Sequence, residues 1–118
     1  MNQAPADWTV GTPALYVQRC AACSARWYFR RTFCPRCGHE DVRTQAAAGT
    51  GTIHSATSVA RAPTEAWRAH APYTIVLVDL DEGVRVMAHG TNGLVIGQRV
   101  AVTFEKRADR LVPVFHPL

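Results

Sequence analysis

Two Cys-x-x-Cys pairs constrain this chain more than any other feature of its sequence. Cys20 and Cys23 form the first pair, Cys34 and Cys37 form the second, and the chain has no other cysteine. A two-residue spacer lets one tight turn aim two thiolates at a single point, and Zn²⁺ takes four such ligands at tetrahedral corners. Gly38 directly follows the second pair and supplies the left-handed backbone that such a turn often needs. The spacing predicts a structural zinc site whose four ligand positions are all filled by protein.

Disulfide bonds and a redox-active Cys-x-x-Cys are the alternatives to zinc. Disulfides need an oxidising compartment, and the first residues, Met1 to Pro5, lack the basic and then apolar segment of a secretory signal. A thioredoxin-like site would use one pair beside a βαβ pattern instead of two matched pairs. We therefore expect zinc and a cytoplasmic protein.

The length and charge of the chain favour a small globular protein with a mildly basic cysteine module. Its 118 residues have room for a zinc module and a small barrel, and no apolar run approaches the roughly 18 residues of a membrane span. The net charge is +4, and twelve of the thirteen basic residues are arginine. Half of these arginines lie in or beside the cysteine module: Arg19, Arg26, Arg30, Arg31, Arg36 and Arg43. Their charge could serve a phosphate-bearing ligand, an acidic partner or the thiolates themselves.

The sequence pattern predicts an all-β chain with an N-terminal zinc ribbon followed by a five-stranded barrel of the OB type. We expect residues 1–13 to be an extended or loosely docked lead-in, 14–48 the ribbon and 49–118 the barrel. Within the ribbon, strands are expected at 15–19, 26–30 and 42–45. A ribbon of fewer than about 40 residues buries too little apolar surface to fold without its metal.

Five short strands separated by turn signals are expected in the barrel, at 52–60, 73–80, 84–89, 100–104 and 111–115. Alternation in the first of them puts Ile53, Ser55, Thr57 and Val59 on one face. Pro113 marks the last strand as an edge, because proline cannot donate to a ladder.

The order and spacing of these segments resemble the DUF35 family of thiolase-associated, acyl-CoA-binding OB-fold proteins with a rubredoxin-like zinc ribbon. The resemblance covers residues 14–117. The segments that carry it are Leu15-Tyr16-Val17-Gln18-Arg19-Cys20-Ala21-Ala22-Cys23, Phe33-Cys34-Pro35-Arg36-Cys37-Gly38, Gly51-Thr52-Ile53, Ala71-Pro72-Tyr73 through Asp81-Glu82-Gly83, and Val112-Pro113-Val114-Phe115-His116-Pro117.

This resemblance implies a non-catalytic accessory subunit. Such a subunit would bind acyl-CoA and dock or complete a thiolase, aldolase, acyl-CoA synthase or enoyl-CoA hydratase in lipid, steroid or polyketide metabolism. The four cysteines correspond to the zinc ligands of the family. The chain departs from the family in one respect: members commonly carry a longer helical segment before the ribbon, whereas only nineteen residues precede Cys20.

Trp27, Arg30, Arg31 and Trp67 are the candidate residues for a ligand or partner surface. Aromatic rings beside arginine can stack an adenine and clamp phosphates. Alternation in 26–30 puts Trp27 and Phe29 on one face, and the competing interpretation packs both against the barrel while the arginines stay solvated. Trp67 could anchor a partner or cover the open end of the barrel.

Two other functions remain open from the sequence. A ribbon followed by an OB barrel also suits a single-stranded nucleic-acid-binding protein, although the outward residues Arg85, Met87 and His89 form no aromatic platform. An enzyme is the weaker alternative, because no nucleophile motif or phosphate loop is present. The five histidines, His39, His54, His70, His89 and His116, form no metal-ligand pair, and His54 or His89 could at most act as a general base.

Overall fold

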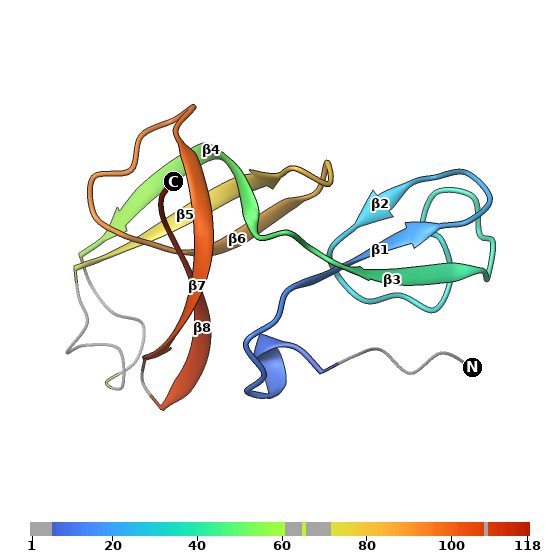
Figure 1. The fold of residues 1–118 in the computed structure, drawn as a ribbon, viewed down its shortest axis with the longest axis horizontal. Helices are drawn as coiled ribbons and strands as arrows, with labels where there is room; N and C mark the ends of the chain where they lie inside the picture. The colour runs from blue at the N-terminus through green and yellow to red at the C-terminus, as the bar shows by residue number, and fades with distance from the viewer. Residues whose placement is uncertain (1–5, 61–64, 66–71, 108) are drawn as a thin grey trace.

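The computed structural model describes residues 6–60, 65, 72–107 and 109–118, and almost every element in them is a β-strand. A short 3₁₀ helix, η1 (Trp8–Val10), precedes a three-stranded sheet and a closed five-stranded barrel, which lie end to end (Figure 1). The predicted all-β fold class is confirmed. The strands are β1 (Tyr16–Cys20), β2 (Arg26–Trp27), β3 (Val42–Ala46), β4 (Thr50–Val59), β5 (Tyr73–Leu80), β6 (Arg85–Gly90), β7 (Arg99–Arg107) and β8 (Arg110–Pro117).

The three-stranded sheet, called the ribbon sheet below, has the antiparallel order β2-β1-β3. Its strand β2 has only two residues, so the strand predicted over 26–30 is too long. The chain leaves the sheet after Trp27, because the residues that follow make their contacts with η1. The Tyr28 hydroxyl accepts a hydrogen bond from the Trp8 indole, and Arg30 pairs with Asp7.

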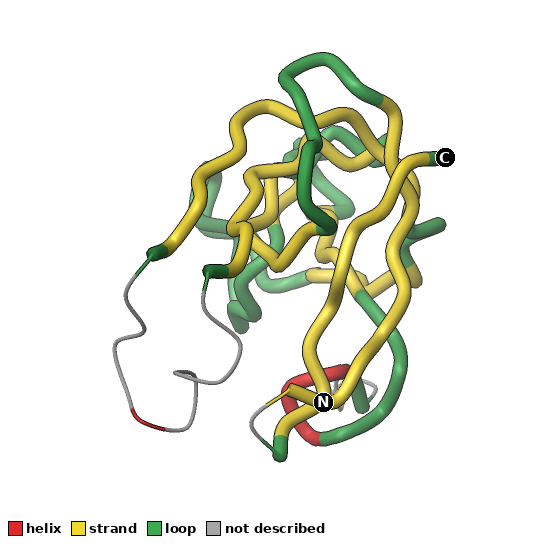
Figure 2. Tube along the Cα trace, turned by 90° about the vertical axis from the view of Figure 1, so that its left-hand side faces the viewer, coloured by secondary structure: helices red, strands yellow, loops and turns green. Residues whose placement is uncertain are grey.

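The barrel has the strand order β4-β5-β6-β8-β7 and closes where β4 pairs with β7 at Thr50–Thr52. Figure 2 shows the strands in yellow, joined by loops and turns in green. Strand β8 pairs with β7 along its length and with β6 in parallel, so the predicted edge strand is wrong. The parallel pairing involves only Val114 and Phe115 of β8. Pro113 lies just outside it, and there its missing N–H removes no ladder bond to β6.

A β-bulge at His54 divides β4 into two halves. Ile53 lies opposite Val78 and Ser55 lies opposite Leu77, which leaves His54 as the extra residue. Residues opposite each other in an antiparallel pair share a face, and Ala56 lies opposite the buried Val76. The prediction that Ile53, Ser55, Thr57 and Val59 share one face is therefore wrong, because the bulge reverses the alternation after Ile53.

The hydrophobic core fills the barrel and continues into the ribbon sheet at β1 and the residue before it. Leu15 and Val17 belong to the same buried cluster as the barrel residues, which are Ile53, Val76, Val78, Leu80, Val84, Val86, Ala88, Leu94, Val100 and Phe115. The ribbon and barrel also share two hydrogen bonds to Glu82, from the Arg26 guanidinium and the Ala48 N–H. In the described part of the chain, no helix is long and apolar enough to cross a membrane.

Candidate metal centre

The two Cys-x-x-Cys pairs form two turns of the same shape. The first turn follows β1, and the second lies in the loop between β2 and β3. In each turn the fourth residue after the first cysteine donates its N–H back to that cysteine's carbonyl oxygen, from Ser24 to Cys20 at 3.0 Å and from Gly38 to Cys34 at 2.9 Å. Both donors have positive φ, 63° for Ser24 and 80° for Gly38. The predicted role of Gly38 is confirmed, and Ser24 plays the same role without being glycine.

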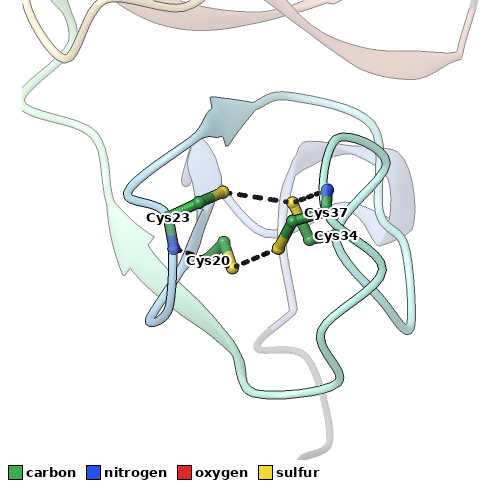
Figure 3. A group of neighbouring side chains, drawn as sticks. All are labelled: Cys20, Cys23, Cys34 and Cys37. Carbon is green, nitrogen blue, oxygen red and sulfur yellow. Dashed lines mark hydrogen bonds between the residues drawn. The ribbon is translucent and has the colours of Figure 1, made fainter.

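The turns face each other and bring the four sulfurs together (Figure 3). Sγ–Sγ distances are 3.6 Å for Cys20–Cys37 and 3.6 Å for Cys23–Cys34, and all four sulfurs lie within 4.8 Å of one another. A tetrahedral Zn–S₄ centre with bonds of about 2.3 Å has edges of about 3.8 Å. The four thiols are free. Their spacing and chemistry therefore fit a metal ion such as zinc.

Backbone N–H groups support the first sulfur of each pair. Cys20 Sγ accepts from Ala22 and Cys23, and Cys34 Sγ accepts from Arg36 and Cys37. For Cys20 the bond from the Cys23 N–H is the largest influence and lowers the pKa. Burial alone would raise the pKa of Cys34, but the bonds from Cys37 and Arg36 and the neighbouring thiols together lower it to about 6. In each turn the pKa of the first cysteine is thus lowered, which favours the thiolate form that metal binding requires.

His39, two residues after the last cysteine, belongs to the turn and not to the sulfur cluster. Its Nδ1 accepts the N–H of Asp41 at 3.0 Å, and its own carbonyl oxygen accepts the N–H of Cys34. The cluster of possible metal ligands found in the described residues contains the four cysteines alone.

Gln18, a residue that the sequence did not single out, organises the candidate ligand surface. This side chain of β1 is 7% exposed, and its Oε1 accepts the Trp27 indole N–H at 2.6 Å and the Arg31 backbone N–H at 2.7 Å. Arg30 bridges to Asp7 with an N–O distance of 3.2 Å, while Arg31 is exposed. Three of the four candidate residues are thus neighbours, and Trp67 lies outside the described residues.

The packing of the aromatic residues after β2 differs from both interpretations of the sequence. Phe29 is 76% exposed, and Tyr28 packs against the hydrophobic core. Burial raises the pKa of Tyr28, so its hydroxyl stays protonated near neutral pH. Simple alternation failed here because the strand ends at Trp27, and residues beyond a strand no longer follow a period of two.

The lead-in is docked by η1, which the sequence analysis missed. Asp7 caps η1 by accepting from the Thr9 N–H at 3.0 Å, and Gly11 ends it with φ of 88°. Trp8 packs against the core and donates its indole N–H to the Tyr28 hydroxyl at 2.7 Å. The signal was present as a capping aspartate and a terminating glycine around an aromatic residue, but three residues are too few for helical periodicity to show.

Comparison with known proteins identifies the family. Residues 44–105 match the family described as ChsH2, C-terminal OB-fold domain. A DUF35 domain-containing scaffold protein from Methanothermobacter thermautotrophicus is 31% identical over 93 residues, which make up 75% of this chain and 69% of that protein. The chain belongs to the DUF35 family. The predicted resemblance is confirmed.

Two further relatives of this DUF35 chain carry the names of acyl-CoA or aldolase enzymes. A probable enoyl-CoA hydratase alpha subunit from Thermomonospora curvata is 34% identical over 108 residues, 87% of this chain and 33% of that protein. The DUF35 chain therefore spans about a third of the length of that relative. A solved structure described as an Ltp2-ChsH2(DUF35) aldolase superposes with a TM-score of 0.74 at 33% identity, covering 88% of this chain and 84% of that one.

Proposed function

We propose that the chain is a non-catalytic accessory subunit that docks an acyl-CoA enzyme of the thiolase, aldolase or enoyl-CoA hydratase type. The observation that carries this proposal is the match over 88% of the chain to the DUF35 protein of an aldolase complex. The relative named as a scaffold protein supports the same role. Acyl-CoA is the proposed ligand, bound by this chain or at its junction with the partner, and the cytoplasm is the proposed location.

We further propose that Cys20, Cys23, Cys34 and Cys37 hold one structural Zn²⁺. Four protein sulfurs fill a tetrahedral shell, so the ion would join the two knuckles without offering a position to a substrate. Metal analysis of the purified chain should give one zinc per chain. Cobalt substitution should give the intense thiolate-to-metal absorption of a tetrahedral S₄ site, and less than stoichiometric metal at neutral pH would contradict the assignment.

A tagged pull-down from an extract of the source organism tests the docking role. We expect stoichiometric recovery, at moderate salt, of a thiolase-like, aldolase or hydratase subunit identified by mass spectrometry. Cys34→Ser is the variant to compare with the parent chain in this pull-down, because it removes a proposed zinc ligand and leaves the barrel sequence intact. Recovery of nucleic acid or ribosomal proteins that is lost as the salt concentration rises would instead indicate a nucleic-acid-binding protein.

A further inference from the structure

A cleft of about 280 Å³ lies between η1 and one face of the ribbon sheet. Gln18 and Thr44 are opposite each other in the sheet and Tyr16 is two residues along β1, so these three side chains share the face that forms the floor. The walls come from η1 and from the segment after β2. The lining is Asp7, Trp8, Thr9, Tyr16, Gln18, Tyr28, Phe29, Arg30 and Thr44, of which four are aromatic.

Gln18 places a hydrogen-bond donor in this cleft. Its Oε1 accepts two N–H groups that can only donate, from the Trp27 indole and the Arg31 backbone. Those partners fix the orientation of the carboxamide, because a flipped amide would set its NH₂ against both donors. Within the described residues, the Nε2 group has no hydrogen-bond acceptor, although the residue is only 7% exposed. A donor that lines a cleft and has no protein acceptor is available to an acceptor on a ligand.

The walls of the cleft are held in place before any ligand arrives. Trp8 donates to the Tyr28 hydroxyl at 2.7 Å, and the Arg30 guanidinium bridges to Asp7, which is itself 7% exposed. Phe29 lies at the rim with 76% of its surface exposed, and its ring centroid is 5.5 Å from that of Tyr28. Fixed aromatic walls favour a planar ligand, because little conformational freedom is lost when it binds.

We propose that this cleft binds the adenine ring of an adenine nucleotide. Every base has an apolar face that stacks on aromatic and guanidinium groups, and a purine ring nitrogen supplies the acceptor for Gln18 Nε2. The cleft volume is below that of sites that enclose a whole drug-sized ligand, about 300–1,000 Å³. We place the base in the cleft and the sugar and phosphates outside it, beside the exposed Arg31, whose backbone N–H donates to Gln18.

The choice of nucleotide rests on the proposed function. Coenzyme A ends in adenosine 3′,5′-bisphosphate, so an accessory subunit of an acyl-CoA enzyme would hold that end of its ligand here. AMP and ATP contain the same adenine ring, so the test must distinguish binding of these nucleotides from binding of coenzyme A.

An NMR titration of the zinc-loaded, nitrogen-15-labelled full chain is the test. The probes are AMP, ATP, adenosine 3′,5′-bisphosphate, coenzyme A and inorganic phosphate. We expect the side-chain signals of Gln18 NH₂ and Trp8 indole N–H to shift saturably with every adenine nucleotide and not with phosphate. Coenzyme A and the bisphosphate should bind more tightly than AMP or ATP.

Two exposed phenylalanines on the ribbon provide a matched pair of variants. Phe29→Ala removes a ring at the rim of the cleft and should weaken binding roughly tenfold, the order expected for one stacked base. Phe33→Ala removes a 50% exposed ring that does not line the cleft and should leave the affinity unchanged. Neither side chain is buried, so both variants should fold.

The outcomes separate this inference from the proposed function. Absence of saturable shifts at Gln18 and Trp8, or equal affinities for the two variants, would overturn the adenine site even if the pull-down recovers an enzyme partner. Binding of AMP at the cleft without a preference for coenzyme A would support the site and remove coenzyme A as its ligand. A much tighter, salt-sensitive complex with an adenine oligonucleotide would overturn the choice of a free nucleotide.

Discussion

Ser24 and Gly38 occupy the same position in the two knuckles, with φ of 63° and 80°, yet only one of them is glycine. A left-handed backbone costs a non-glycine residue about 1–2 kcal/mol. Glycine avoids this cost, but part of the gain is offset because glycine has more conformational freedom in the unfolded chain. We therefore expect Ser24→Gly to stabilise the ribbon by about 0.5–1 kcal/mol. Because ribbon folding is coupled to metal binding, chelator competition should show apparent zinc affinity rising roughly two- to fivefold.

Gly38→Ala should act in the opposite direction by a similar amount. An added Cβ would meet nothing within 4 Å, so the loss would be purely conformational. Gly93→Ala is the control, because Gly93 has φ of 87° and equally open surroundings but lies in a barrel turn. A change in zinc affinity with Gly93→Ala as large as with Gly38→Ala would argue against a local effect.

Asp79 and Asp81 make the stability of the barrel depend on pH. Arg85 donates to Asp79, and Arg99 donates to both oxygens of Asp81 at 2.7 and 2.9 Å, which lowers both pKa values below that of a free aspartate. Folding thus favours the ionised forms. Their contribution is complete above about pH 5 and is lost as the pH falls below about 4.

Melting temperatures measured between about pH 3 and pH 6 should therefore fall towards the acid end. The fall should be smaller in Asp81→Asn, which cannot ionise, than in the parent chain. Thr57→Ala, an exposed site on β4 whose side chain does not ionise, should keep the parent's pH dependence. An unchanged slope in Asp81→Asn would exclude the Asp81–Arg99 pair as its source.

At the level of the strand, Gly51 shows how closely β4 and β5 approach each other. A Cβ at this position would lie 2.5 Å from the backbone oxygen of Asp79, and backbone cannot yield as a flexible side chain can. Gly51→Ala should destabilise the barrel by about 2–3 kcal/mol, in the range of overpacking. Thr57→Ala, in the exposed half of β4, should cost less than about 0.5 kcal/mol. Denaturant unfolding of the two variants makes the comparison, and equal midpoints would contradict it.

Secondary-structure elements were predictable from the sequence where the apolar residues of a segment and the turn residues at its end indicated the same element. Strand β5 and the turn after it were found because 73–80 has apolar residues on both faces and Asp81-Glu82-Gly83 is a turn signal, and in the structure Gly83 has φ of 85°. The cysteine spacing gave a cluster that the structure brings together. The His54 bulge could not be found, because the small and polar residues 55–58 carry no apolar alternation that would reveal the change of face after Ile53.

The cleft also lay beyond sequence patterns, because its parts come from four separate segments. Trp8 and Tyr28 are twenty residues apart and meet through one hydrogen bond. Gln18 resembles any polar residue of a short strand until the Trp27 indole and the Arg31 N–H are seen to converge on it. Such side-chain networks depend on tertiary structure and not on local propensity.

At the scale of the whole molecule, the ribbon and barrel should respond differently to loss of zinc. The proposed zinc would supply much of the core of the ribbon, whereas most of the buried hydrophobic cluster lies in the barrel. Chelation, or Cys34→Ser, should unfold the ribbon and leave the barrel's dispersed NMR amide signals in place. A boundary near residue 48, as proposed from the sequence, would then separate the lost signals from the retained ones.

The barrel should nevertheless become less stable, because Leu15 and Val17 are 5% and 0% exposed within the same cluster as Val76 and Phe115. Full burial of an aliphatic side chain is worth about 1.5–3 kcal/mol. If Leu15 and strand β1 detach from the barrel when zinc is lost, the free energy of unfolding of the barrel should fall by about 3–6 kcal/mol, measured by denaturant titration followed at barrel amides. Unchanged barrel stability would show that Leu15 and Val17 stay docked without the metal. Loss of every dispersed signal would show one cooperative unit, in which the zinc ribbon is required for the barrel to fold.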